Sequence, residues 1–503
     1  MKTIYYAILC LFIITITTMT YAEQRISNKD LVLLPVKNDP TVAFRIWFKV
    51  GSQNDPKGKE GLANITAQML TDASTEKNNY EQILDKLYPL AASYSASVNV
   101  EMTVIYGRTH KDNLAEYYPL FMDAILHPAF KQEDLDRIKS QILNYIENTL
   151  RYASDEELGK AILYNEIFAG TGYGHITSGT IEAVKSITLN DIRDFYKKYY
   201  TKNNLVIGVG GGYDMKLIDE LKNNLSTLSD GIVKPPPKPR PQNINGQQFT
   251  MIEKEAPATA ISMGFPINVL RGTKDWYALA IATSWLGEHR NSSSHLYQVI
   301  REARGLNYGD YAYIENFPNG GRYQLPPQNV SRRQQIFEIW IRPVPNETRH
   351  FTLRAALREF KKLTENGMSE DQFNLTRKFL RNYVLHFAPT TMERLGYAID
   401  DKFYNVKGSH IEMFRKMMTE LKLEDVNAAI KKHWQIKNMQ IAVITKDAQA
   451  FKDALINDTA SPITYKTPKP ESVLAEDKEI GSFAVKVKPE QVKIEKVENL
   501  FIK

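Results

Sequence analysis

The chain has 503 residues, a length that favours roughly two to four domains. Hydrophobic residues make up 43% of it and charged residues 24%, which is the composition of a globular protein and excludes a disordered or fibrous chain. The formal net charge of +6 is modest for this length, and no dense run of Lys and Arg interleaved with aromatic residues occurs, which argues against nucleic-acid binding.

The N-terminus predicts export. Lys2 precedes the apolar run IYYAILCLFIITI, and the small or permissive residues TMTYA follow, so residues 1–22 are interpreted as a signal peptide that is cut after Ala22. The only cysteine, Cys10, lies inside it, so the mature chain is expected to lack disulfides and thiol chemistry. No later run is long and apolar enough to predict stable membrane insertion. We therefore expect a secreted protein, most simply a periplasmic one.

Residues 26–228 are predicted to form the first domain. Apolar or alternating runs predict strands at 31–36, 42–50 and 205–209 and a strand pair within 93–109. Amphipathic runs predict helices at 62–71, 80–90, 113–126, 133–150, 156–167, 189–200 and 215–225. Paired strands with helices grouped between them predict an α+β sandwich with a mostly antiparallel sheet.

A second domain, residues 248–460, is predicted because the sequence repeats. DIRDFYKKYYTKNNLVIGV from Asp191 has a counterpart 234 residues later in DVNAAIKKHWQIKNMQIAV from Asp425, and QILNYI has one 238 residues later in FLRNYV. Two matching stretches at nearly one offset indicate a duplicated domain. The proline-rich segment between the halves, residues 229–247, is predicted to be a semi-rigid linker, with a PxxP ligand as the alternative.

The C-terminal stretch, residues 461–503, is rich in Lys, Glu and Pro. FAVKVKP and QVKIEKV alternate like exposed strands, which favours an extended arm that packs across the body. A solvated tail of low order is the alternative that the sequence leaves open.

The segment GSQNDPKGKEGLANITAQML, from Gly51 to Leu70, follows a strand-like run with a glycine-rich turn and a helix that begins G-L-A. It resembles the opening of the pitrilysin/insulinase metallopeptidases, whose helix carries the inverted zinc motif H-x-x-E-H. Here the five motif positions are Asn64, Ile65, Thr66, Ala67 and Gln68. Zinc takes imidazole, thiolate or carboxylate ligands, so the neutral amides at two of these positions are poor substitutes and the alanine cannot act as a base.

The third zinc ligand of that family is a glutamate on a later helix, which RIKSQILNYIENTL resembles. Tyr145 falls on the glutamate's position, and Glu147 is the nearest carboxylate. The resemblance therefore implies that all four catalytic positions are vacant and that this chain binds no zinc. Asn64 and Gln68 are then ordinary polar residues of a helix.

The second half contains SSSHLYQVIREARGLNYGDYAYI, from Ser292 to Ile314. In the insulinase-like family an Arg and a Tyr seven residues apart, in a segment ending G-L-x-Y, grip the substrate beside the scissile bond, and the resemblance places them at Arg301 and Tyr308. A guanidinium offers fixed donors to peptide carbonyls and a phenol adds an orientable one. The alternative is that Arg301 lies on a solvated helix face and Tyr308 is an aromatic residue beside a strand.

Other motifs predict no chemistry. GVGGGYD lacks the ending of a phosphate-binding loop, no G-x-S-x-G elbow occurs, and no two of the nine histidines lie four residues apart. Glu288, His289 and His295 form the only close acid–histidine group, and a replacement zinc site there is disfavoured because a serine-rich turn separates them.

In the bacterial branch of the insulinase-like family, one subunit often carries zinc and a second carries the Arg/Tyr pair with a vacant zinc motif. The resemblance therefore implies a non-zinc subunit of an exported heterodimeric peptidase, with peptide substrates and with zinc in the partner. A non-catalytic peptide-binding or assembly scaffold of the same fold is the main alternative. A self-sufficient enzyme with unrecognised catalytic residues is the second.

Overall fold

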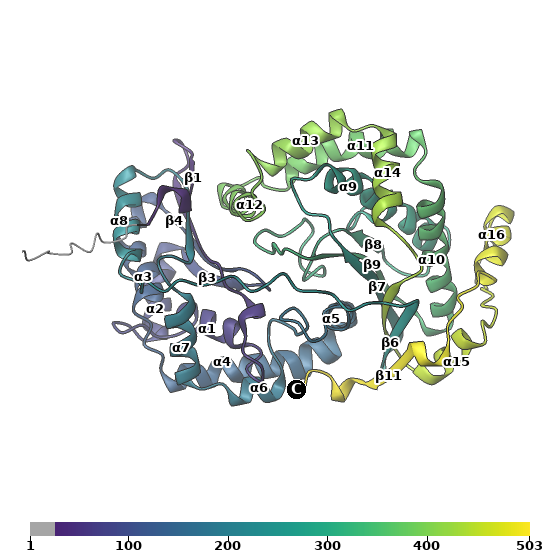
Figure 1. Ribbon diagram of the computed structural model, residues 1–503, viewed down its shortest axis with the longest axis horizontal. Coiled ribbons are helices and arrows are strands. Elements are labelled where there is room, and N and C mark those ends of the chain that lie inside the picture. Colours follow the sequence, from purple (N-terminus) through teal and green to yellow (C-terminus); the bar gives the residue numbers. More distant parts are fainter. Residues whose placement is uncertain (1–25) are drawn as a thin grey trace, which may run out of the picture.

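The computed structural model describes residues 26–503, so the predicted signal peptide lies outside the described residues. Two α+β domains face each other, each built on one sheet with helices packed against it (Figure 1). The predicted fold class is confirmed. Between residues 26 and 503, no helix combines the length and the apolar character that crossing a membrane requires.

The first sheet has five strands in the order β1-β5-β2-β4-β3. Their bounds are β1 Leu31–Pro35, β2 Thr41–Phe48, β3 Ser93–Val98, β4 Thr103–His110 and β5 Leu205–Gly211. Only the β1–β5 pair is parallel, so the sheet is mostly antiparallel as predicted. β3 lies at one edge and has a hydrogen-bonded neighbour on one side only.

Helices of the first domain follow the predicted order. Their bounds are α1 Leu62–Thr71, α2 Tyr80–Leu87, α3 Leu114–Leu126, α4 Gln132–Asn144, α5 Asp155–Ile167, α6 Ile181–Ser186, α7 Leu189–Tyr199 and α8 Met215–Leu225. The prediction of one α-helix over 133–150 is wrong, because the α-helix ends at Asn144 and a π-helical segment, Tyr145–Ala153, continues it. The short helix α6 was not predicted.

The second sheet has six strands in the order β11-β6-β10-β7-β9-β8. Their bounds are β6 Gln247–Glu253, β7 Ala258–Ile267, β8 Asp310–Tyr313, β9 Gln335–Pro345, β10 Met439–Thr445 and β11 Val492–Lys496. The helices are α9 Lys274–Gly287, α10 Arg349–Asn366, α11 Glu370–Tyr383, α12 Thr391–Tyr404, α13 His410–Glu420, α14 Leu423–His433, α15 Ala448–Ile456 and α16 Glu471–Gly481. The pair α14–β10 repeats α7–β5 residue for residue at the offset seen in the sequence, which confirms the two homologous domains.

One helix of each domain packs on the sheet of the other domain. α5 packs on β7 and β10 of the second sheet, and α12 packs on β1, β2 and β5 of the first (Figure 1). Gly159 lies where α5 meets β7, since a Cβ there would come within 3.2 Å of the Ser262 hydroxyl. Ile399 of α12 is fully buried against the first sheet. Because of this exchange, neither sheet has both faces covered by its own domain alone.

The linker and the C-terminal arm also join the domains. The linker contains no helix or strand up to β6, and its Gln242 backbone N–H donates to the carbonyl of Ile167 at 2.7 Å. In the arm, β11 pairs parallel to β6, and the Ile181 N–H of the first domain donates to the Phe501 carbonyl at 2.8 Å. The expectation of a strand at FAVKVKP is wrong, because those residues form no strand and instead bury Val485 and Val487.

Cutting the linker is expected to leave the two halves associated, because the exchanged helices and the arm hold them by buried contacts that the linker does not make. A specific protease site placed between residues 234 and 238 would allow the cut after folding. The expected result is co-elution of the two fragments in gel filtration, with the uncut variant as the control. Separate elution in the absence of denaturant would show that the linker holds the domains together.

Candidate functional site

The helix that carries the vacant motif is firmly held at its N-terminus. The buried carboxylate of Asp55, from the GSQNDP turn, accepts from the backbone N–H of Gly61 at 2.8 Å and of Ala63 at 2.7 Å. It also lies 3.1 Å from Nε2 of His175. Burial raises the pKa of Asp55, and these hydrogen bonds oppose that rise. Gly61 has a φ of +100° where the chain approaches Ser178, a conformation that favours glycine.

At the motif positions the donor set does not suit zinc. Asn64 and Gln68 are partly exposed on one side of α1, and the Gln68 amide N–H donates to Asn64 Oδ1 at 3.2 Å. Ala67, at the position of the general base, is fully buried. Two neutral amides satisfied by each other replace the two imidazoles, so these residues do not fit the metal. Across residues 26–503 no group of three His, Cys, Asp or Glu side chains could hold a metal ion.

The position of the third ligand is also changed. Tyr145 is the first residue of the π-helical segment and lines a cavity between the two domains. Burial raises the pKa of its phenol, which keeps Tyr145 protonated and uncharged at neutral pH. The carboxylate of Glu147 lies 4.0 Å from Nζ of Lys185 on α6. The nearest acidic side chain in the sequence is therefore paired with a cation on a neighbouring helix.

Arg301 and Tyr308 are brought together. The Arg301 guanidinium carbon lies 5.7 Å from the centre of the Tyr308 ring, which is within the range of a cation–π contact. Tyr308 is 77% exposed, so the pair faces solvent. Arg301 lies on the helical segment Tyr297–Glu302, and Tyr308 precedes β8.

Buried neighbours anchor the loop that presents this pair. Arg304 is buried and forms ion pairs of 2.8 Å with both Glu476 and Asp477 of α16. Asn307 donates to the carboxylate of Asp310 at 2.8 Å, and Asp310 is itself fully buried at the start of β8. The loop is thus fixed from both sides, while the exposed Tyr308 and the half-buried Arg301 remain available to a partner.

A cavity of about 260 Å³ lies between the domains and was not predicted. Tyr145, Lys160 and Tyr164 reach it from the first domain, and Asn316 and Arg332 reach it from the second. The cavity forms because α5 crosses to the second sheet, and no local sequence pattern predicts that crossing. A lysine one residue after Gly159 on an otherwise apolar turn of α5 is the only signal that could have marked it.

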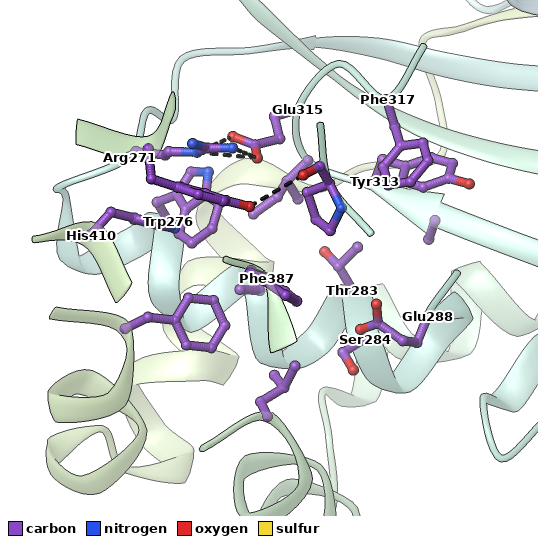
Figure 2. A pocket seen from close by; sticks show the side chains of 17 residues that line it. Arg271, Trp276, Thr283, Ser284, Glu288, Tyr313, Glu315, Phe317, Phe387 and His410 are labelled. Atoms are coloured by element: carbon purple, nitrogen blue, oxygen red, sulfur yellow. Dashed lines mark hydrogen bonds and ion pairs between the residues drawn. The ribbon is translucent and has the colours of Figure 1, made fainter. Parts of the chain in front are cut away.

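A second cavity, of about 90 Å³, lies inside the second domain (Figure 2). Arg271 and Glu315 form an ion pair of 2.6 Å at one side, and Ser284 and Glu288 lie at the other. Its walls are mostly aromatic or aliphatic, with Trp276 and Phe387 among them. None of the predicted site residues lines it.

The Glu288, His289 and His295 group does not form a metal site. Glu288 lines the 90 Å³ cavity, whereas His295 pairs with Glu359 at 2.7 Å. Both ring nitrogens of His289 are engaged, one with the Tyr313 hydroxyl at 2.7 Å and the other with the Tyr323 carbonyl at 3.0 Å. Burial lowers the pKa of His289 to about 3, so its ring is neutral and structural.

Comparisons with known proteins agree with this geometry. Residues 31–180 match the family model described as insulinase (peptidase family M16), and residues 186–380 match the model described as peptidase M16 inactive domain. The chain is 22% identical to the non-peptidase homolog YmxG of Helicobacter pylori over 84% of this chain and 94% of that protein. It is 23% identical to an uncharacterized zinc protease of Streptomyces coelicolor, over 66% of this chain and 69% of that protein.

Among solved structures, the fold is similar to a peptidase M16 inactive domain from Pseudomonas fluorescens. The TM-score is 0.72 with 22% sequence identity, and the match covers 83% of this chain and 95% of that chain. At this identity the likeness concerns the fold alone.

Proposed function

The chain belongs to peptidase family M16, as an inactive member, and we propose that it is the non-zinc subunit of an exported heterodimeric peptidase of that family. In this proposal a zinc-bearing subunit of similar fold supplies the metal and the general base. This chain binds the peptide substrate and completes the partner's active site.

The observation that carries the proposal is a contrast within one chain. Every zinc and base position is replaced, yet the helix that bears them keeps its capping by Asp55 and its place in the core. Arg301, at the end of a helical segment, meanwhile lies beside the exposed Tyr308 of the anchored loop that follows it. This contrast supports a chain that binds no zinc of its own and offers Arg301 and Tyr308 to a partner.

The roles follow from the chemistry of these groups. The Arg301 guanidinium offers N–H donors in a fixed planar geometry, which can stabilise the oxyanion formed when water attacks a peptide carbonyl. The Tyr308 hydroxyl adds a donor that can rotate to follow the same oxygen. The free edge of β3 offers backbone donors and acceptors to an extended peptide, which supports binding as an added strand.

Peptide hydrolysis by this chain alone, by a zinc-bearing family member encoded beside it, and by their mixture tests the proposal. We expect activity only in the mixture, because each subunit alone lacks part of the site. Metal analysis of this chain is expected to find no stoichiometric zinc. Activity or stoichiometric zinc in this chain alone would contradict the proposal, and failure to bind any zinc-bearing relative would favour an assembly scaffold.

A further inference from the structure

The cavity between the domains is lined by two buried cations that form no ion pair with any residue the structure describes. Arg332 is 5% exposed and Lys160 is 4% exposed, and both line the cavity. Within the described chain, residues 26–503, neither forms an ion pair shorter than 4.0 Å. A buried charge is costly unless it is paired, so two of them beside one cavity need an explanation.

Their surroundings satisfy them only in part. Lys160 donates one hydrogen bond to the Phe317 carbonyl and lies 4.4 Å from the centre of the Trp340 ring, which leaves donors of its ammonium group free. Arg332 stacks on the Tyr164 ring at 4.9 Å, and among residues 26–503 its Nε has no hydrogen-bond partner. The Tyr164 hydroxyl in the same wall also has none.

The acidic groups nearby form no ion pair of 4.0 Å or less with these cations within residues 26–503. Glu157 lines the cavity, but its two oxygens accept from the backbone N–H groups of Asn319 and Gly320, at 3.1 and 2.8 Å. Glu338 is fully buried on β9 with both oxygens unpartnered. Burial raises the pKa of Glu338 to about 7, so it carries only part of a negative charge at neutral pH. The two carboxylates are thus held elsewhere or buried, and the free donors of Lys160 and Arg332 remain open to a ligand in the cavity.

We propose that this cavity binds a carboxylate, held by the Arg332 guanidinium and the Lys160 ammonium group. A planar guanidinium matches the two oxygens of a carboxylate, and both charge-assisted bonds gain strength away from water. The volume of about 260 Å³ accommodates the carboxylate with a few attached carbons, which suits the C-terminal residue of a peptide or a small free acid.

That the bound carboxylate belongs to a peptide rests on the proposed function. That the cavity prefers a carboxylate does not. Isothermal titration of this full chain alone tests both. The probes are a tripeptide with a free C-terminal carboxylate, the same tripeptide with a C-terminal amide, and succinate. We expect the free tripeptide to bind and its affinity to fall about tenfold or more on amidation, since a charged hydrogen-bond acceptor is lost.

Arg332→Gln is expected to lower the affinity for the free tripeptide by a similar factor. Arg381→Gln, on the exposed face of α11, is the matched control. The amidated probe keeps the test valid if Arg332→Gln fails to fold. Binding of succinate but of neither peptide would support the carboxylate site and assign it to a free acid. Equal binding of the two tripeptides, or no binding of any probe, would overturn the proposal. Because no partner is present, this failure is distinguishable from failure of the heterodimer.

Discussion

Replacing Arg301 by alanine is expected to lower the turnover number of the mixed peptidase by about 10²- to 10³-fold, the loss that follows removal of one donor to a developing oxyanion. Assembly with the zinc-bearing subunit and the thermal stability of this chain should change little. The reason is structural: Arg301 contacts the exposed Tyr308 ring, whereas Arg304 and Asp310 anchor the loop independently of it. Initial-rate kinetics and gel filtration of the mixture measure the two effects.

The expected pattern is a lower kcat with an almost unchanged KM, because the donor acts in the transition state more than in substrate binding. Tyr308→Phe should lower turnover in the same direction, since it removes only a hydroxyl. Arg381→Ala, an exposed arginine of α11, is the matched control and should leave turnover unchanged. Unchanged turnover in both Arg301→Ala and Tyr308→Phe would remove the catalytic contribution assigned to this pair.

The sequence predicted those parts of the fold whose signals are local. α1 and α8 have the bounds that amphipathic periodicity predicts, and the repeat of α7–β5 in α14–β10 could be recognised from the sequence alone. The vacant motif and the Arg/Tyr segment were recognised because family motifs are short and contiguous. Each of these signals is carried by short contiguous segments, and the repeat is recognised by comparing two such segments.

What the sequence did not reveal depends on contacts between distant segments. The change to a π-helix at Tyr145 replaces one helical hydrogen-bond pattern by another, and the amino-acid composition does not indicate it. β2 is buried on both faces, with Arg45 among its buried residues, because α12 arrives from the other domain. The cavity with Lys160 and Arg332 follows from the reciprocal crossing of α5. Periodicity reports how a segment is covered, and it cannot report which domain covers it.

Because α5 and α12 each pack on the sheet of the other domain, the two domains are expected to unfold together. Ile399→Ala is expected to lower the free energy of unfolding by about 2–5 kcal/mol, the usual cost of removing a fully buried aliphatic side chain that leaves a cavity. Ile399 belongs to the second half of the sequence, yet it packs with Trp47, Met102 and Val206 of the first sheet, and its Cδ1 would lie 3.0 Å from a Cβ at Gly208.

The decrease in the free energy of unfolding should therefore affect both domains at once. Urea unfolding followed by tryptophan fluorescence and by far-ultraviolet circular dichroism is expected to give coincident transitions that shift together, since a helix shared between two sheets couples their stability. Leu375→Ala on α11, where the side chain is 71% exposed, is the control and should stay within about 0.5 kcal/mol of the parent. A transition that splits in two, or a loss of unfolding free energy near that of Leu375→Ala, would mean that α12 covers the first sheet without stabilising it. The linker and the C-terminal arm would then hold the two domains together.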